Sequence, residues 1–397
     1  MSPEDPMAKL PTTSPKRPRL RALAAVAALT SIASAASPAE AAPCAELPNP
    51  VYVTGGGRVF LESLGKVLGP QGTTVVYLLQ GSCLAVNAIL SGTKITGPAV
   101  YWNATSELTC ELDPAGQNAD LGISSVFPST CLSLPSGLPA GVSDIQGPVE
   151  AHVFVVPEAS TQRTISMEAA YFVFGFGIAS GVAPWDDETQ MFRRDPNSGT
   201  QQMMGLAIGV PPEKWKGTDA GASSGVVMGL SMTATPEKAI GILTTQIANE
   251  QELLVNPLAY QAHEQTCAYW PDSTAVARDK RNVRDGHYAI WGPTHLLTRV
   301  NANGFPLSTG ADTLINYITS TQEIISLLAT TGLVPQCAMR VRRTSELGPL
   351  ASFAPDQSCS CFYESVAIGK TSCQSCTSSV ECPSDAPRCN YGFCEVQ

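Results

Sequence analysis

Charged residues are scarce in this sequence. They make up 15% of its 397 residues, and no basic stripe with interleaved aromatic residues occurs, which disfavours nucleic-acid binding. The four histidines have no metal-ligand spacing, and the Gly-x-Ser-x-Gly motif of serine hydrolases is absent. Because nucleophile, base and metal sets are all missing, the sequence predicts neither an enzyme nor a bound cofactor.

Long apolar runs are also missing. Residues 22–33 form an alanine-rich apolar stretch that is too short for a good membrane span, and basic residues between Lys16 and Arg21 precede it. Small residues suited to signal cleavage follow at 33–35 and 39–41. We therefore expect an export signal over residues 1–43 and a periplasmic or secreted mature protein.

The sequence does contain a repeated local pattern, in which an apolar strand leads into a turn with glycine and a hydroxyl residue and then into a helix. Residues 51–53 lead into Thr54-Gly55-Gly56-Gly57, and residues 73–79 lead into Gln80-Gly81-Ser82. The amides of a first helical turn have no partner within the helix, so such turns are typical of anion sites.

A third copy of the pattern carries the most chemistry. The extended run Met191 to Arg194 is followed by a turn and then by Ser198-Gly199-Thr200, which opens a helical pattern. Ser198 is a good N-cap, Gly199 lets an anion approach the backbone, and Thr200 adds a hydroxyl. Arg194 can fork onto an oxyanion. By itself this stretch also fits an ordinary strand-to-helix turn, but three copies together can surround one tetrahedral oxyanion.

On these residues the chain resembles the phosphate-binding proteins of ABC importers, in the two-lobed periplasmic binding protein superfamily. The resemblance rests on Val53 to Gly57, on Gln80-Gly81-Ser82 and, most specifically, on Arg194 with Ser198-Gly199-Thr200. Weaker matches to the family, in the same order along the chain, extend the resemblance over roughly residues 48–340. They lie at residues 120–125, 165–171, 238–241, 284–288 and 332–335.

The resemblance implies an α/β, two-lobed periplasmic-binding-protein fold with a cleft between the lobes. The first lobe would cover residues 44–148, the second lobe 149–281, and the chain would return to the first lobe over 282–340. It also implies that phosphate or a related oxyanion binds in the cleft and that an ABC permease is a partner. We expect a monomer. The implied ligand-binding residues are Thr54, Gly55, Gly56, Ser82, Ser125, Arg194, Ser198, Gly199 and Thr200.

One position departs from the family pattern. Where the family usually has Gly-x-Ser-Asp, with an aspartate that accepts a hydrogen bond from a protonated phosphate oxygen, this chain has Ser125. A serine both donates and accepts and carries no charge, so we expect weaker discrimination between phosphate and sulfate. Asp120 and Asp195 are alternative acceptors, but both precede their turns. A solvated turn carboxylate is therefore the preferred interpretation of Asp120.

The expected mature chain is acidic. Without residues 1–43 it keeps 19 basic and 31 acidic residues, a formal charge of −12. Such a charge does not gather anions through a long-range field. Capture must therefore depend on helix starts, hydroxyl groups and Arg194.

Other apolar stretches predict the elements around this site. Residues 228–232 and 239–243 are short apolar runs suited to buried strands. Residues 312–330 have the period of an amphipathic helix, which Gly332 would end.

Thirteen cysteines in an exported chain predict disulfides, with one thiol left over. Cys110 and Cys131 flank a loop and are a candidate pair, although the sequence does not fix the pairing. For Cys83 a small buried hydrophobic residue is the preferred interpretation. Cys44 would carry a lipid if it were the first mature residue, which the preceding Pro43 disfavours.

Seven of the cysteines lie within 36 residues, from Cys359 to Cys394, beyond a linker over 341–358. So little apolar sequence forms no core, and cross-links must replace it. Cys373-x-x-Cys376 is also a zinc-type pair, but no second pair at finger spacing accompanies it. We expect a disulfide-rich module over 359–397 with an unknown partner. Importers do not need such a module, so an extracellular interaction or adhesion protein with a vestigial cleft is the alternative function.

Overall fold

The computed structural model describes residues 41–320 and 322–396. The export signal expected over residues 1–43 lies outside the described residues except for 41–43. Within the described ranges, no helix combines the length and the apolar character that crossing a membrane requires.

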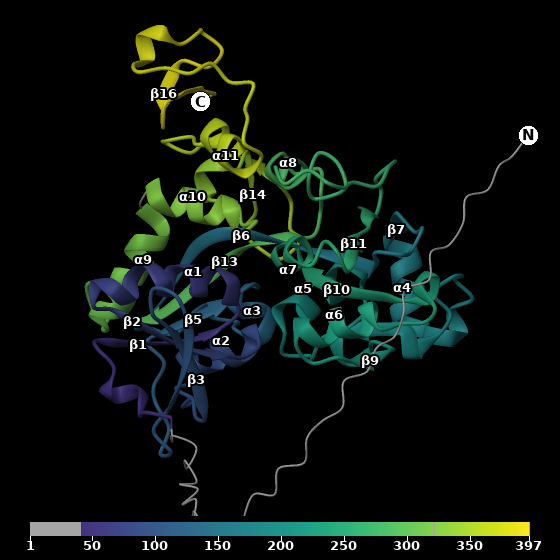
Figure 1. Cartoon of the computed structure of the whole chain (residues 1–397), viewed down its shortest axis with the longest axis horizontal. Helices are drawn as coiled ribbons and strands as arrows, with labels where there is room; N and C mark the ends of the chain where they lie inside the picture. Colours follow the sequence, from purple (N-terminus) through teal and green to yellow (C-terminus); the bar gives the residue numbers. More distant parts are fainter. Residues whose placement is uncertain (1–40, 321, 397) are drawn as a thin grey trace, which may run out of the picture. The chain divides into compact units, whose positions relative to one another are not determined.

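A sheet of eleven strands runs through the described chain (Figure 1). Its order is β4-β3-β2-β1-β5-β13-β6-β10-β8-β9, and β11 also pairs with β6. The strands are β1 (Pro50–Gly55), β2 (Thr74–Leu79), β3 (Pro98–Trp102), β4 (Glu107–Glu111), β5 (Leu121–Ser124), β6 (Val142–Pro157), β8 (Met191–Arg193), β9 (Thr218–Asp219), β10 (Ile240–Thr244), β11 (Val255–Pro257) and β13 (Trp291–Arg299).

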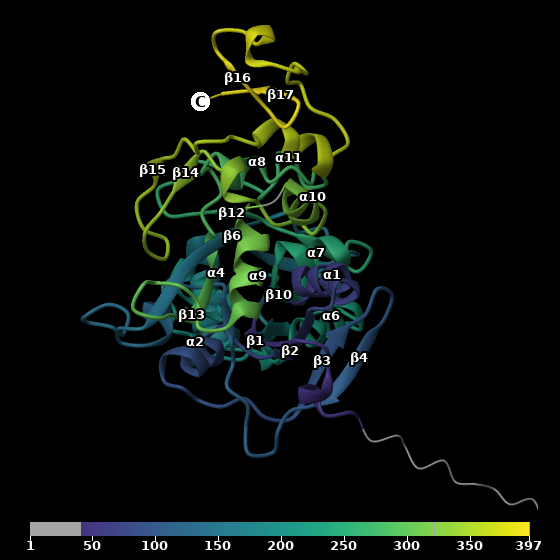
Figure 2. The same cartoon turned by 90° about the vertical axis from the view of Figure 1, so that its left-hand side faces the viewer.

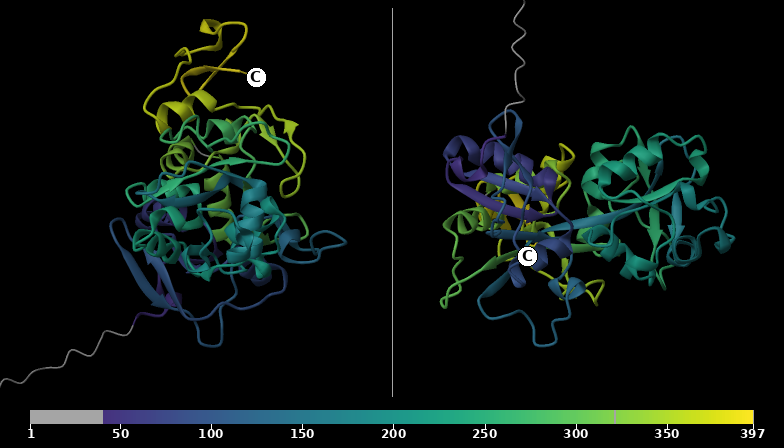
Figure 3. Two further views of the ribbon diagram at one scale, coloured as in Figure 1. Left: turned by 90° about the vertical axis from the view of Figure 1, so that its right-hand side faces the viewer. Right: turned by 90° about the horizontal axis from the view of Figure 1, so that it is seen from below.

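Two long strands, β6 and β13, connect the halves of this sheet. β13 pairs with β6 from Val142 to Ala151, whereas β10 and β11 pair with β6 from His152 to Pro157. The purple and blue half in Figure 1 is the first lobe, and the teal half is the second lobe. The right-hand view of Figure 3 shows strands passing between them. The predicted two-lobed α/β fold is confirmed, while the residue bounds expected for each lobe stay a prediction.

The first lobe is built from strand–turn–helix units. β1 pairs in parallel with β2 and β5, and these strands lead into α1 (Arg58–Leu68), α2 (Ser82–Leu90) and α3 (Pro128–Cys131). α1 is amphipathic, and its Leu61 and Leu64 side chains are fully buried against the sheet. A β-carbon on Gly65 would come within 2.7 Å of the Trp102 ring, so the close packing of α1 depends on glycine there.

The second lobe corrects one prediction. Its helices are α4 (Met167–Phe176), α5 (Gly199–Ile208), α6 (Ser223–Ser231) and α7 (Thr245–Glu250), and β7 (Thr164–Ser166) pairs with β12 (Ala259–Gln261). The strand predicted over 239–243 is β10, but the one predicted over 228–232 is wrong because that stretch belongs to α6. Val226, Val227 and Leu230 are buried and Met228 is exposed, which is helical spacing. Apolar composition alone does not separate a short buried strand from a helix.

The C-terminal part packs on the helices that follow β13. The helix predicted over 312–330 corresponds to α9 (Thr309–Ser320) and α10 (Gln322–Thr330), on either side of residue 321. In Figure 2 the yellow helix α11 (Ser360–Ala367) lies beside α10. Arg284 bonds to Glu364 of α11 at 3.0 Å. The smaller elements are α8 (Arg281–Arg284), β14 (Val341–Arg342), β15 (Ala351–Ser352), β16 (Arg388–Asn390) and β17 (Phe393–Glu395).

Disulfides hold this C-terminal module, as predicted. The pairs are Cys337–Cys359, Cys361–Cys373, Cys376–Cys389 and Cys382–Cys394. Every cysteine of the module is therefore used in a cross-link, so none is a thiolate available to zinc. The predicted leftover thiol is Cys267, which is exposed.

The candidate pair Cys110–Cys131 is wrong. Cys110 bonds to Cys44, and Cys131 bonds to Cys83, because α2 and α3 pack side by side and bring Cys83 to the end of α3. Cys83 is buried as expected, but as part of a disulfide and not as a free hydrophobic residue. Because the Cys44 sulfur is also bonded, it is not free to carry a lipid.

Candidate functional site

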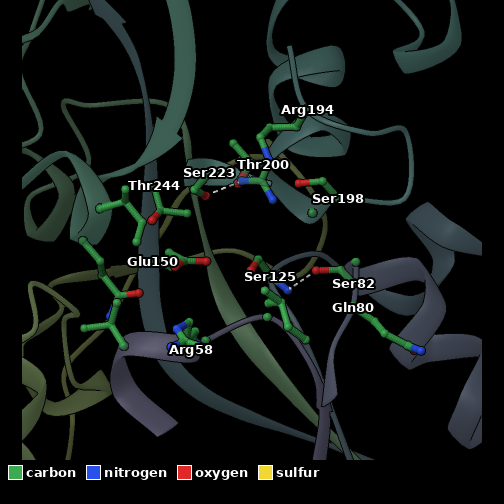
Figure 4. A pocket seen from close by; sticks show the side chains of 18 residues that line it. Arg58, Gln80, Ser82, Ser125, Glu150, Arg194, Ser198, Thr200, Ser223 and Thr244 are labelled. Carbon is green, nitrogen blue, oxygen red and sulfur yellow. Dashed lines mark hydrogen bonds between the residues drawn. The ribbon is translucent and has the colours of Figure 1, made fainter. Parts of the chain in front are cut away.

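A small cavity of about 90 Å³ lies where the two lobes meet (Figure 4). Four helices of nine or more residues, α1, α2, α5 and α6, start at its wall, and α7 starts beside it. The first amides of a helix have no partner within it, and its dipole is positive at that end. The wall of the cavity is therefore suited to an anion.

Thr54 lies outside the residues that line this cavity. Its side chain is fully buried. Its hydroxyl lies 3.2 Å from both the Leu78 carbonyl oxygen and the Gln80 side-chain oxygen. These contacts link the ends of β1 and β2, so Thr54 has a packing role in this structure.

The glycines after β1 shape the wall. Gly55 has a φ of +123°, and a β-carbon there would come 2.0 Å from the Ile123 carbonyl oxygen, so only glycine lets β1 approach β5 this closely. Like Thr54, Gly55 is not among the lining residues. Gly56 does line the cavity, but its amide donates to the Ile123 carbonyl at 3.0 Å. The amides that remain for a ligand here are those at the start of α1, from Arg58.

Ser82 and Ser125 form the hydroxyl part of the first-lobe wall. The Ser125 amide donates to the Ser82 hydroxyl oxygen at 3.0 Å, which leaves the hydroxyl hydrogen of Ser82 for a ligand. Ser82 opens α2, and the Cys83–Cys131 disulfide fixes that helix end to α3. The Cys83 amide also donates to the Asn197 carbonyl of the second lobe at 3.1 Å, so the two lobes touch beside the cavity.

Three predicted residues at the start of α5 line the opposite side. Ser198 stands at the N-cap position but its side chain makes no capping hydrogen bond, contrary to the prediction. Ser198, Gly199 and Thr200 are all buried in the cavity wall. A β-carbon on Gly199 would meet the Ser82 hydroxyl oxygen at 2.3 Å, so the closeness of the lobes requires glycine here.

Arg194 supplies the positive charge of the cavity. Its Nε donates to the Gly221 carbonyl at 2.7 Å and its Nη1 donates to the Ser223 hydroxyl at 2.5 Å. Both partners are uncharged, and within the described residues no carboxylate forms an ion pair with Arg194. Burial lowers the pKa of Arg194, an effect that the nearby charges of Asp195 and Glu150 oppose. The guanidinium points into the cavity (Figure 4).

Sequence reasoning missed Glu150. This residue lies on β6 at the crossing between the lobes, is 3% exposed and lines the cavity. Burial raises the pKa of Glu150 to about 6, while a hydrogen bond from the Ser125 side chain and the charge of Arg194 oppose that rise. The sequence did contain a signal: Glu150 and His152 are polar residues at alternate positions in the otherwise apolar second half of β6, residues 148–157.

The alternative acceptors considered from the sequence do not line the cavity. Asp120 accepts a hydrogen bond from the Tyr52 amide at 2.9 Å, and so it is not the solvated turn carboxylate that the sequence favoured. Asp195 accepts from the Asn197 amide within its own turn at 3.0 Å. Glu150 is therefore the acidic side chain among the described lining residues.

Buried polar atoms without a partner occur on β6 and at the start of α7. Both ring nitrogens of His152 and the amide nitrogen of Gln246 have no hydrogen-bond partner within the described part of the chain. Burial lowers the pKa of His152 to about 3, so the ring is neutral. Gln246 lines the cavity, and its amide can donate to a ligand. The sequence carried a signal here too, since β10 leads into Thr244-Thr245-Gln246, a further strand, hydroxyl turn and helix start.

A larger groove of about 950 Å³ adjoins the cavity and shares Arg58 and Arg194 with it. Arg58 forms an ion pair with Glu107 on β4, so its charge is already partnered. Exposed apolar side chains, among them Leu79 and Met228, line the groove.

Seven of the nine predicted site residues thus line one cavity, and Thr54 and Gly55 do not. Lining residues that the prediction lacked include Glu150, Ser223 and Gln246.

No protein-family model matches this sequence, and no curated protein matches it. Solved structures do. A putative phosphate ABC transporter substrate-binding protein with bound phosphate, from Clostridium perfringens, is similar over 72% of this chain and 99% of that chain, with 13% identity and a TM-score of 0.50. An ABC-type phosphate transport receptor from Vibrio cholerae is similar over 72% and 99%, with 12% identity and a TM-score of 0.44. A possible phosphate binding protein from Planctomyces limnophilus is similar over 73% and 93%, with 11% identity and a TM-score of 0.43.

The fold assignment rests on the first of these structures, since the other two have lower scores. At 13% identity the likeness concerns the fold and not the ligand. The resemblance seen in the sequence is confirmed at that level: this chain has the fold of a phosphate ABC transporter substrate-binding protein.

Proposed function

We propose that this protein is an exported solute-binding protein that captures phosphate or a similar tetrahedral oxyanion between its two lobes and passes it to an ABC permease. It acts as a monomer and without chemistry on the ligand. The observation that carries the proposal is the convergence of Arg194 and the starts of four helices on one small cavity.

The volume of the cavity and its free hydrogen-bond donors support a small anion as the ligand. Its volume of about 90 Å³ is well below the roughly 300–1,000 Å³ of pockets for organic ligands. Two donors of the wall that remain free, the Ser82 hydroxyl and the Arg194 guanidinium, come from different lobes and face one space (Figure 4). A tetrahedral oxyanion offers oxygens in all these directions. Closure about β6 and β13 is the expected motion on binding.

Isothermal titration of the oxidised, signal-free protein with phosphate, sulfate and arsenate tests the proposal. We expect phosphate to bind at micromolar or tighter affinity. Arg194→Ala should weaken phosphate binding on the order of 100-fold or more, because it removes a buried charge partner of the ion. Arg193→Ala is the matched control, since Arg193 pairs with Asp219 outside the cavity. Absence of heat and of any thermal shift with all three ions would refute the proposal.

One observation favours a second function, an extracellular interaction protein with a vestigial cleft. Three of the four disulfides of the C-terminal module lie within the module, and the module presents Val380 at 95% exposure. A failed anion titration would make this second function the better account.

A further inference from the structure

The groove beside the anion cavity is large enough for an organic group. Its volume of about 950 Å³ lies within the roughly 300–1,000 Å³ of pockets that hold organic ligands, whereas the cavity of about 90 Å³ is far smaller. The two spaces adjoin, because residues such as Leu79, Arg194 and Ser223 line both of them. A group bonded to an ion in the cavity would therefore lie next to the groove.

One side of helix α6 continues from the cavity into the groove. Ser223, at the start of the helix, lines both spaces and accepts a hydrogen bond from Arg194. Val227, Met228 and Ser231 line the groove but not the cavity. Their spacing puts them on the same side of the helix as Ser223, and at 1.5 Å per residue this lining extends about 12 Å along the axis. The helix that helps to hold the anion therefore also forms a wall of the groove.

Large apolar side chains are exposed in this groove. Leu79 at the end of β2, Met228 on α6 and Leu254 beyond α7 are 53%, 60% and 39% exposed. Single exposed apolar residues are ordinary on a protein surface, but these three come from both lobes and line one groove. A methionine side chain also adapts its shape to different apolar partners. An apolar group in the groove would remove this surface from water, which favours binding.

The charges of the groove disfavour a second anionic group. Among the described residues that line it, the charged side chains are Arg58, Arg194 and Asp195. Both arginines also line the cavity, and Arg58 is paired with Glu107. Farther along α6 the lining offers no cation to a second phosphate group, and Asp195 would repel one. An uncharged, largely apolar group is therefore the occupant that fits.

The side that the cavity shares with the groove also suits an ester oxygen. Leu79 and Ile247 line both spaces, and their side chains have no hydrogen-bond donor. An anionic oxygen turned toward them would lose its hydrogen bonds to water without replacement. A bridging ester oxygen carries no full charge, so its burial there costs less.

We propose that this protein binds phosphate monoesters that have an uncharged, largely apolar substituent. The phosphate group occupies the cavity, and the substituent occupies the groove between α6, Leu254 and the end of β2. This inference rests on the proposed anion-binding function and extends it from the inorganic ion to a class of organic phosphates.

Isothermal titration of the oxidised, signal-free protein with inorganic phosphate, methyl phosphate and phenyl phosphate provides the first test. Methyl phosphate has an ester oxygen but no group that can fill the groove. We expect phenyl phosphate to bind at least as tightly as inorganic phosphate and roughly 10-fold more tightly than methyl phosphate, because an aromatic ring becomes partly buried.

Phenyl phosphate that binds more weakly than inorganic phosphate, or no more tightly than methyl phosphate, would overturn the proposal and leave the anion-binding function intact. Binding of none of the three compounds would instead refute the anion-binding function itself.

A double substitution in the groove provides the second test. Met228→Ser with Leu254→Ser removes two apolar side chains from the groove, so phenyl phosphate should bind roughly 10-fold more weakly, while inorganic phosphate should stay within about 2-fold of the wild type. Met232→Ser with Leu253→Ser is the matched control and should change neither affinity, because these side chains are 77% and 85% exposed and do not line the groove. Equal losses for both ligands, or no loss for phenyl phosphate, in the folded groove variant would overturn the proposal. If that variant does not fold, the wild-type affinities decide.

Discussion

The two sides of the cavity are built differently. The first-lobe side presents the Ser82 hydroxyl and helix amides, carries no free charge, and is fixed by backbone hydrogen bonds and the Cys83–Cys131 disulfide. The second-lobe side presents Arg194, whose guanidinium is held by uncharged groups. We infer that the neutral side determines the size of the bound ion and the charged side determines the affinity.

Gly199→Ala would break the close contact between the two sides of the cavity, and we expect it to lower phosphate affinity more than the other substitutions of uncharged residues in the wall. The new β-carbon would lie 2.3 Å from the Ser82 hydroxyl oxygen and 3.0 Å from the Ser125 β-carbon. Relief of such overpacking costs about 1–3 kcal/mol, so phosphate affinity should fall roughly 5- to 150-fold by titration. Gly175→Ala on α4 is the control, because its β-carbon would meet only Val210, at 3.3 Å. Unchanged affinity in Gly199→Ala would show that the lobes do not meet as described.

Glu346→Gln tests whether a buried carboxyl group behind Ser125 stabilises the first-lobe side of the cavity. Glu346 accepts a hydrogen bond from the Phe127 amide at 2.5 Å, just beyond Ser125. Burial raises the pKa of Glu346 to about 7, while the Phe127 amide and the charges of His295 and Arg343 oppose that rise. An acid whose folded-state pKa is raised contributes stability that is full below its unfolded pKa of about 4.3 and is lost as the pH rises through the folded pKa.

The free energy of unfolding should therefore fall by about 1–3 kcal/mol between pH 5 and pH 8 in the wild type. Glu346→Gln keeps an oxygen acceptor for Phe127 but cannot ionise, so most of this fall should disappear. Part of it should persist, since the pKa of Glu150 is raised in the same direction. Denaturant titrations at the two pH values measure the effect. A pH dependence as steep in Glu346→Gln as in the wild type would contradict this account.

The smallest expected effects separate two hydroxyls of the first lobe. Ser82→Ala removes one neutral donor to the ion and should weaken phosphate binding about 5-fold, since such a bond contributes about 1 kcal/mol. Thr54→Val should leave the affinity within about 2-fold and lower stability by about 1 kcal/mol, because the Thr54 hydroxyl bonds only inside the protein. If Thr54→Val weakened binding more than Ser82→Ala, the assignment of the wall would be wrong.

Local patterns made much of the site predictable. The strand, hydroxyl turn and helix start each leave a clear mark in the sequence, and Ser82, Arg194 and Thr200 follow from it. The same pattern recurs at Thr244, where β10 leads into α7. What a turn residue does once folded was less predictable: Thr54 and Gly55 fit the motif, but their side-chain and backbone atoms are taken up by β2 and β5.

Long-range arrangement accounts for the remaining misses. The disulfide partners of Cys83 and Cys110 depend on how α2, α3 and β4 come together, which spacing along the chain does not encode. Glu150 is visible in the sequence only as a polar residue within an apolar run, and its place in the cavity follows from β6 crossing between the lobes. The strand predicted over residues 228–232 was wrong because a run of five residues is too short to separate the strand period from the helix period.

Anomalous diffraction from crystals grown with arsenate tests the central claim most directly, because arsenic marks the position of the ion independently of any variant. The account predicts a strong arsenic peak in the cavity, with oxygens in hydrogen-bonding contact with Arg194 on one side and Ser82 on the other. An arsenic peak only outside this cavity, or no peak from a protein that binds arsenate in solution, would contradict it.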